Sequence, residues 1–167
     1  MTNEPARTIV KTLPKSSPFL YITIAGLVAG TLDLIAAFIQ NGLRGIGPVR
    51  ILQSIASGLL GTASYSKGSS SALLGLFLHF FIATTAALVY YVASRRLRPL
   101  LTRPLVWGPV YGVIVWLVMN LIVLPLSAFP HRQSFAPMNV ATGLWIHIFF
   151  VGLPIALIIR RERQSPD

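Results

Sequence analysis

The chain contains no cysteine, and only four of its 167 residues are acidic. Without cysteine it can form no disulfide, thiolate metal site or iron–sulfur cluster, and it has no cysteine nucleophile. The acidic residues are Glu4, Asp33, Glu162 and Asp167, which leaves no paired carboxylates for hydrolysis or phosphoryl transfer. Phosphate-binding, zinc-protease and serine-hydrolase motifs are absent as well. We therefore expect a protein that is not an enzyme.

Charged residues are also scarce, at 11% of the chain, whereas a soluble domain typically carries about 25%. Hydrophobic residues make up 54%, and they concentrate in four runs that each reach the roughly 20 residues needed to cross a bilayer. These runs cover residues 19–39, 72–93, 104–126 and 140–159. The pattern predicts an all-α fold, an integral membrane four-helix bundle. It forms a single domain over residues 19–159, with tails at 1–18 and 160–167.

Lysine and arginine give the chain a formal net charge of +10. They lie in short segments beside the spans and form no basic face with interleaved aromatics, so we expect the lipid bilayer and not nucleic acid as a partner. One side of the membrane receives Arg7, Lys11, Lys15, Arg95, Arg96, Arg98, Arg103, Arg160, Arg161 and Arg163. The other side receives Arg44, Arg50, Lys67 and Arg132. Because positive residues mark the cytoplasmic side, we expect both termini there.

The connection between the first and second spans is long enough to hold a further element. Pro48 opens a segment, residues 48–60, in which apolar residues recur at helical spacing. This segment is too short to span a bilayer, so we expect a short amphipathic helix along the outer surface. Re-entry against the bundle is the alternative. Residues 65–71, rich in glycine and serine, are expected to form a flexible link, and residues 127–139 an irregular loop.

The second and fourth spans begin alike. Residues Gly75–Phe81 read GLFLHFF and residues Gly143–Phe149 read GLWIHIF, so that glycine, leucine, an aromatic, an aliphatic and histidine recur in order. The first and third spans share a glycine pair. Both similarities join helices of the same direction, which is the pattern of a parallel repeat. We expect the second helical hairpin to be a duplicate of the first.

The two glycine pairs are Gly26 with Gly30 on the first span and Gly108 with Gly112 on the third. Each pair is spaced by four residues and therefore lies on one helix face, where small residues let helices approach closely. We expect both pairs to pack helices within the bundle. Homodimerisation through one of these faces is the alternative.

One polar residue lies inside each span: Asp33, His79, Asn120 and His147. At 1.5 Å per residue, the histidines lie about 10 Å below the outer helix ends, and Asp33 and Asn120 lie about 9 Å below them. An ionised aspartate facing lipid would cost about 2.5–3.5 kcal/mol on the insertion scale. We therefore expect the four residues to converge on the bundle axis as a buried polar layer.

Three interpretations of this polar layer remain open. It can be a hydrogen-bonded lock that organises the bundle. It can bind or pass a proton or small solute, since an aspartate beside histidine is a suitable proton acceptor. It can also hold a cofactor, either a haem between His79 and His147 or a divalent metal on these histidines and Asp33. The first two interpretations need no cofactor.

Five stretches carry a resemblance to a known family. They are Arg50–Gly58, Leu78–Ala83, Met119-Asn120, Pro125–Ser127 and Gly152–Ala156. They resemble segments of a family of small, uncharacterised bacterial inner-membrane proteins with four spans, over about residues 20–161. The resemblance implies a location in the bacterial inner membrane and brings no assigned activity. An accessory role in a larger membrane complex is a further alternative.

Overall fold

The computed structural model of the chain describes residues 17–131 and 134–164. These residues form helices and short connections, and no strand occurs among them. Four helices are long and apolar enough to cross a membrane: Pro18–Gly42, Gly68–Arg96, Pro104–Leu126 and Pro137–Glu162. The predicted all-helical four-span bundle is confirmed. The third span has the predicted bounds, and the other three extend further at both ends.

Some spans are divided into shorter elements. In chain order the elements are α1 (Pro18–Gly42), α2 (Pro48–Leu60), η1 (Gly61–Ser66), α3 (Gly68–Arg96), α4 (Pro99–Thr102), α5 (Pro104–Val118), η2 (Met119–Val123), α6 (Leu124–Leu126), α7 (Pro137–Ile146), η3 (His147–Gly152) and α8 (Leu153–Gln164). The segment η1 is a 3₁₀ helix, whereas η2 and η3 are wider π-helical turns inside the third and fourth spans.

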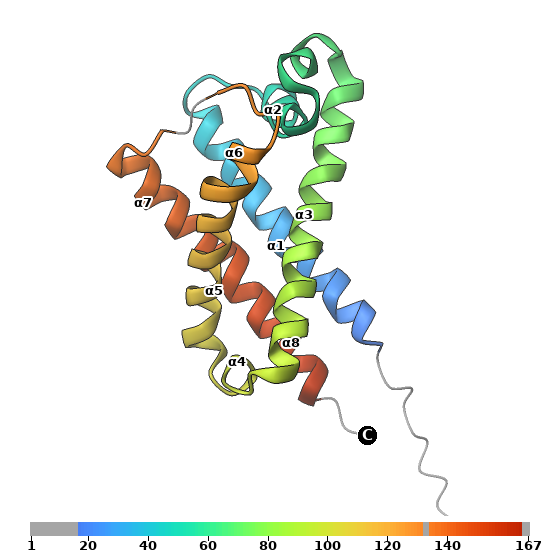
Figure 1. Cartoon of the computed structure of the whole chain (residues 1–167), viewed down its shortest axis with the longest axis vertical. Coiled ribbons are helices and arrows are strands. Elements are labelled where there is room, and N and C mark those ends of the chain that lie inside the picture. The colour runs from blue at the N-terminus through green and yellow to red at the C-terminus, as the bar shows by residue number, and fades with distance from the viewer. Residues whose placement is uncertain (1–16, 132–133, 165–167) are drawn as a thin grey trace, which may run out of the picture.

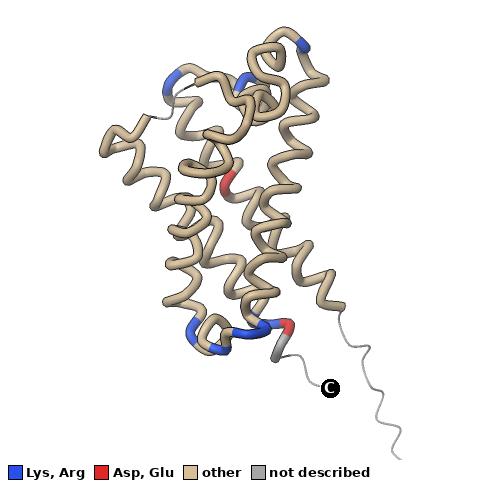
Figure 2. Tube along the Cα trace, viewed as in Figure 1, with Lys and Arg blue, Asp and Glu red and all other residues tan. Residues whose placement is uncertain are grey.

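The spans are arranged so that α1 and the fourth span lie between α3 and α5. Helix α1 packs against α3 and also against η3 and α8, while α5 packs against η3 and α8. The described chain ends lie at the same end of the bundle as α4, and α2 crosses the opposite end (Figure 1). We call these the α4 end and the α2 end. Lys and Arg occur at both ends and not along the middle (Figure 2).

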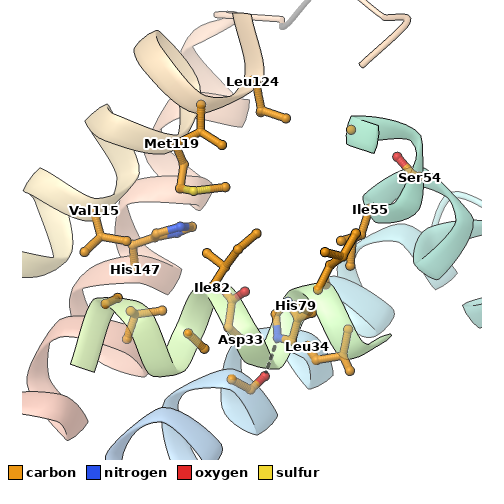
Figure 3. A pocket seen from close by; sticks show the side chains of 18 of the residues that line it. Asp33, Leu34, Ser54, Ile55, His79, Ile82, Val115, Met119, Leu124 and His147 are labelled. Carbon is orange, nitrogen blue, oxygen red and sulfur yellow. Dashed lines mark hydrogen bonds between the residues drawn. The ribbon is translucent and has the colours of Figure 1, made fainter. Parts of the chain in front are cut away.

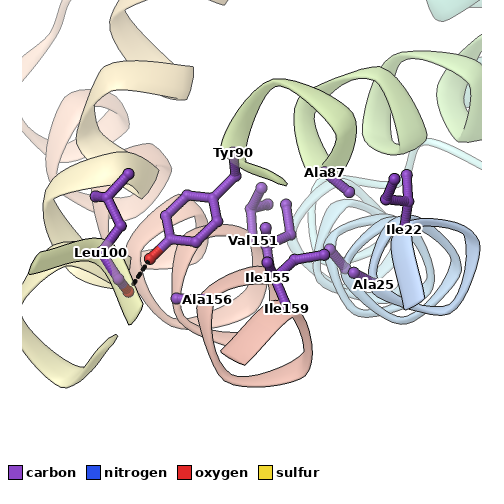
Figure 4. Close-up of a cluster of buried hydrophobic side chains, with 10 residues drawn as sticks. Ile22, Ala25, Ala87, Tyr90, Leu100, Val151, Ile155, Ala156 and Ile159 are labelled. Carbon is purple, nitrogen blue, oxygen red and sulfur yellow. Dashed lines mark hydrogen bonds between the residues drawn. The ribbon is translucent and has the colours of Figure 1, made fainter. Parts of the chain in front are cut away.

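The core fills the half of the bundle nearer α4. Its fully buried side chains include Ala87, Tyr90 and Ile155, each with an exposed fraction of 0%. The Tyr90 hydroxyl donates a hydrogen bond of 2.8 Å to the Leu100 carbonyl (Figure 4), which ties α3 to α4. The Tyr111 hydroxyl of α5 donates a hydrogen bond of 2.6 Å to the Ala86 carbonyl of α3. Apolar packing and satisfied hydroxyls therefore close this half of the bundle.

The glycines of α1 face α3 at close range. A Cβ atom on Gly26 would lie 2.5 Å from the Cα of Thr84, and one on Gly30 would lie 2.9 Å from the Phe80 ring. Real Cβ atoms need more than 3 Å, so α1 and α3 can approach this closely only because both positions lack a side chain.

The glycines of α5 face the fourth span in the same way. A Cβ on Gly108 would lie 3.0 Å from the Cβ of Ala156, and one on Gly112 would overlap the His147 carbonyl. All four glycines therefore pack against helices of their own chain. Their faces are covered, so a homodimer would need another surface.

Helix α2 packs closely on α3 at the α2 end of the bundle. A Cβ on Gly75 would overlap the Leu52 carbonyl of α2, so the two helix backbones are nearly in contact. The last turn of α2 is also held by the Ala128 amide, which donates a hydrogen bond of 2.9 Å to the Gly58 carbonyl. The predicted helix over 48–60 is present. The structure favours its docking against the bundle over a position on the surface alone.

The prediction of a flexible link over residues 65–71 is wrong. These residues form the end of η1 and the first turn of α3. The Ser64 hydroxyl donates 2.9 Å to the Gln53 carbonyl, the Ser71 hydroxyl donates 2.6 Å to the Ser64 carbonyl, and the Gln53 amide donates 3.0 Å to the Gly68 carbonyl. These polar side chains are buried, and their hydrogen bonds to backbone order the segment.

Candidate functional site

A cavity with a volume of about 460 Å³ lies at the α2 end of the bundle, between the four spans and α2. Its walls come from α1, α2, α3, the third span and η3, and most lining residues are apolar or glycine. The polar lining residues are Asp33, Ser54, His79, Asn120, Ser127 and His147. All four residues of the predicted polar layer thus line one cavity. Sequence reasoning did not predict the cavity itself, nor that α2 would cover it.

His79 links α3 to α1. Its Nε2 atom lies 2.7 Å from the Gly30 carbonyl oxygen (Figure 3). A carbonyl can only accept, so Nε2 carries a hydrogen, and in the neutral form of the ring the lone pair is on Nδ1. Among the described residues, His79 is the one member of the predicted polar layer whose side chain forms a hydrogen bond to another span.

His147 and Asn120 bond within their own spans. The Nδ1 atom of His147 lies 3.0 Å from the Gly143 carbonyl, and the Nδ2 atom of Asn120 donates 2.8 Å to the Trp116 carbonyl. Each bond reaches four residues back along the helix. Two of the four residues therefore do not lock neighbouring helices together through hydrogen bonds.

Both residues lie in π-helical turns for the same sequence reason. Asn120 is the second residue of η2 and His147 is the first of η3, and Pro125 and Pro154 follow each turn at the second position beyond its end. Proline has no amide hydrogen and cannot complete the regular α-helical ladder, so the preceding turn widens. Pro125 and Pro154 were the sequence signal for these turns, although Pro109, inside α5, is not preceded by such a turn.

Asp33 reaches the cavity from α1, where it is half-buried. Its side chain points into the cavity in Figure 3, as does the ring of His147. No side chain or amide among the described residues donates a hydrogen bond to its carboxylate, and no cation pairs with it there. The expected bonds from histidine or asparagine to Asp33 are not formed, and the hydrogen bonds of these side chains go to backbone carbonyls instead.

The candidate cofactor ligands do not fit a metal or a haem. Within the described residues, no three histidine or acidic side chains come close enough to hold one metal ion. The Nε2 atom of His79 is directed at the Gly30 carbonyl and not toward His147. Two axial histidine ligands would have to aim at a common iron atom, and this arrangement does not provide that geometry.

The cavity is closed toward the α4 end, where α3 and α5 are joined. Toward the α2 end, the cavity lies between these two helices. Ala86 lines its lower boundary, and the Ala86 carbonyl accepts the hydrogen bond from Tyr111 that joins α3 to α5. Farther toward the α2 end, Ile82 on α3 and Met119 on the third span face each other across the cavity (Figure 3). Ser54 and Ile55 of α2 line its remaining side.

Comparisons with known protein families, with curated proteins and with solved structures found no match. The family resemblance of the five short stretches stays a prediction. The cavity is therefore the feature of this multi-pass membrane-type bundle that bears on its function.

Proposed function

We propose that this membrane protein binds a small, largely apolar molecule in the cavity at the α2 end. The observation behind this proposal is a cavity of about 460 Å³ with mostly apolar walls from all four spans and a few polar groups. Small-molecule sites typically have volumes of about 300–1,000 Å³ and this same composition. The cavity therefore has both the size and the lining of a ligand site.

Binding is favoured over the passage of a proton or solute. Below the cavity, toward the α4 end, the core is filled by residues such as Ala87, Ile155 and Ile159, all with exposed fractions of 0%. The described residues of that core include no acidic or histidine side chain to continue a relay. A transported species would have to open this packing.

The proposal can be tested with 1-adamantanol, a compact neutral molecule, and a variant that fills the cavity. Ala37 lines the cavity on α1, whereas Ala141 on α7 is exposed and lies outside it. We expect saturable binding by the parent and by Ala141→Phe in detergent, and loss of binding in folded Ala37→Phe. Equal binding by all three proteins, or none by the folded parent, would contradict the proposal.

The charge distribution supports an orientation with the α4 end in the cytoplasm, and the family resemblance of the five stretches is what supports a bacterial inner membrane. The described basic residues at the α4 end are Arg95, Arg96, Arg98, Arg103, Arg160 and Arg161, and those at the α2 end are Arg44, Arg50 and Lys67. Since positive residues concentrate on the cytoplasmic side, this orientation places the cavity in the outer half of the membrane.

The glycine contacts support a duplicated hairpin. In the first hairpin, Gly30 faces Phe80, which is the residue after the histidine of its span. In the second, Gly112 faces His147 and Ile148, the histidine and the residue after it. In both hairpins the second glycine of the pair packs beside the histidine, as expected of two copies of one ancestral unit.

A further inference from the structure

The two histidines present hydrogen-bond acceptors to the cavity. His79 uses its Nε2 hydrogen on the Gly30 carbonyl, and His147 uses its Nδ1 hydrogen on the Gly143 carbonyl. A neutral imidazole has one donor and one acceptor nitrogen. The nitrogen left on each ring, Nδ1 of His79 and Nε2 of His147, is therefore an acceptor.

The side chains of two further lining residues donate hydrogen bonds to backbone carbonyls of their own span. Asn120 donates from Nδ2 to the Trp116 carbonyl, which leaves its Oδ1 acceptor and one amide hydrogen. The Ser127 hydroxyl donates 2.8 Å to the Leu124 carbonyl and accepts from the Phe129 amide. The polar part of the lining is consequently richer in acceptors than in donors.

The Asp33 carboxyl has no lysine or arginine beside it among the residues that line the cavity. The two arginines that the structure describes at the α2 end are engaged elsewhere. Arg44 donates 3.0 Å to the Asn139 side chain, and the Arg50 guanidinium lies 3.9 Å from the centre of the Tyr65 ring. Neither arginine lines the cavity. An ionised carboxylate inside a membrane is costly unless a cation or several donors accompany it.

We infer that the ligand of this cavity is a protonated amine with an apolar body, for which Asp33 is the counter-ion and one cavity histidine, His79 or His147, is an acceptor. The inference rests on the proposed function and adds the ligand's chemical class. The three side chains do not converge on one point, and the amine does not need all of them, because an ammonium group supplies several N–H donors, one for Asp33 and another for an imidazole. The apolar walls suit the rest of such a molecule.

A matched pair of probes, 1-adamantylamine and 1-adamantanol, tests this inference because the two share one cage and differ in the polar group. Aliphatic amines are protonated at neutral pH, as in lysine with a pKa of about 10.4. We expect the parent to bind the amine at least about tenfold more tightly than the alcohol. In Asp33→Asn this preference should disappear, while binding of the alcohol is kept. Glu162→Gln, which changes the acid outside the cavity, should keep the preference.

The outcomes separate the two proposals. Equal affinity of the parent for amine and alcohol would overturn the assignment of an amine but leave a binding cavity in place. A preference that survives in folded Asp33→Asn would overturn the role of Asp33. If the folded parent bound neither probe saturably, both the ligand class and the proposed function would be overturned.

Discussion

Gly112 and Tyr90 illustrate how single residues set this fold. A side chain at Gly112 would overlap the His147 carbonyl, so α5 and η3 can pack in contact only because this position is glycine. Tyr90 is fully buried and satisfies the Leu100 carbonyl. The sequence predicted that Gly112 would pack a helix, from its spacing to Gly108. The partner of Tyr90 could not be predicted, because it depends on how the chain turns at α4.

Substitution of Gly112 by alanine should destabilise the bundle. One added methyl group must displace the backbone of η3, and overpacking of this kind costs about 1–3 kcal/mol. Gly42→Ala is the matched control, since nothing lies within 4 Å of a Cβ there. Thermal unfolding in detergent should show a lower midpoint for Gly112→Ala than for Gly42→Ala. Equal midpoints would contradict the close contact.

Removal of the Tyr90 hydroxyl should also reduce stability. Tyr90→Phe leaves the Leu100 carbonyl without its donor inside the core, at a cost of about 1–3 kcal/mol. Tyr91→Phe is the control, because the Tyr91 hydroxyl only accepts a long, exposed bond of 3.5 Å from Arg95. Unfolding of the two variants should differ accordingly, and a neutral Tyr90→Phe would argue against a buried bond.

At the scale of elements, apolar length predicted all four spans, and helical spacing predicted α2. Depth along each helix placed Asp33, His79, Asn120 and His147 at one level, and all four line one cavity without forming hydrogen bonds to one another. The backbone partners of Asn120 and His147 were not predicted, since both residues lie in π-helical turns, before Pro125 and Pro154. The prediction of a flexible link over residues 65–71 was wrong because serine and glycine are common both in flexible linkers and in buried turns held by hydrogen bonds.

The docking of α2 on α3 should depend on Gly75. Because Ala56 of α2 is fully buried and the chain has no native cysteine, a single Ala56→Cys reports on this contact. We expect the introduced thiol to resist an impermeant maleimide in the parent background and to react when Gly75→Ala is added. In a Gly58→Ala background it should stay protected, because a Cβ there meets Ser127 only at 3.9 Å. Protection in all three backgrounds would contradict close docking.

At the scale of the whole molecule, the bundle is asymmetric along its axis. The α4 end is filled by a tight core, whereas the α2 end holds the cavity under a separate helix. Lipid-facing residues such as Phe77 and Leu105 remain exposed over the sides, at 65% and 69%, as a membrane-embedded bundle requires. This asymmetry is not visible in the hydropathy of the spans, which is the same for all four.

The orientation of the bundle should follow its basic residues. A reporter active only in the cytoplasm should work when fused after Asp167 and fail when inserted at Gly45, in the connection before α2. The opposite pattern would place the cavity on the cytoplasmic side. Moving basic residues from the α4 end to the α2 end should lower the fraction of molecules that insert in this orientation, since lysine and arginine near the spans determine it.

The most direct test of the cavity compares two single cysteines in the cysteine-free chain. Met119 lines the cavity, whereas Ile155 is fully buried in the core toward the α4 end. We expect N-ethylmaleimide to modify Met119→Cys but not Ile155→Cys in the folded protein, and 1-adamantanol to slow the reaction at position 119. A cysteine at 119 as unreactive as the one at 155, or one whose reaction the alcohol does not slow, would contradict a ligand cavity at the α2 end.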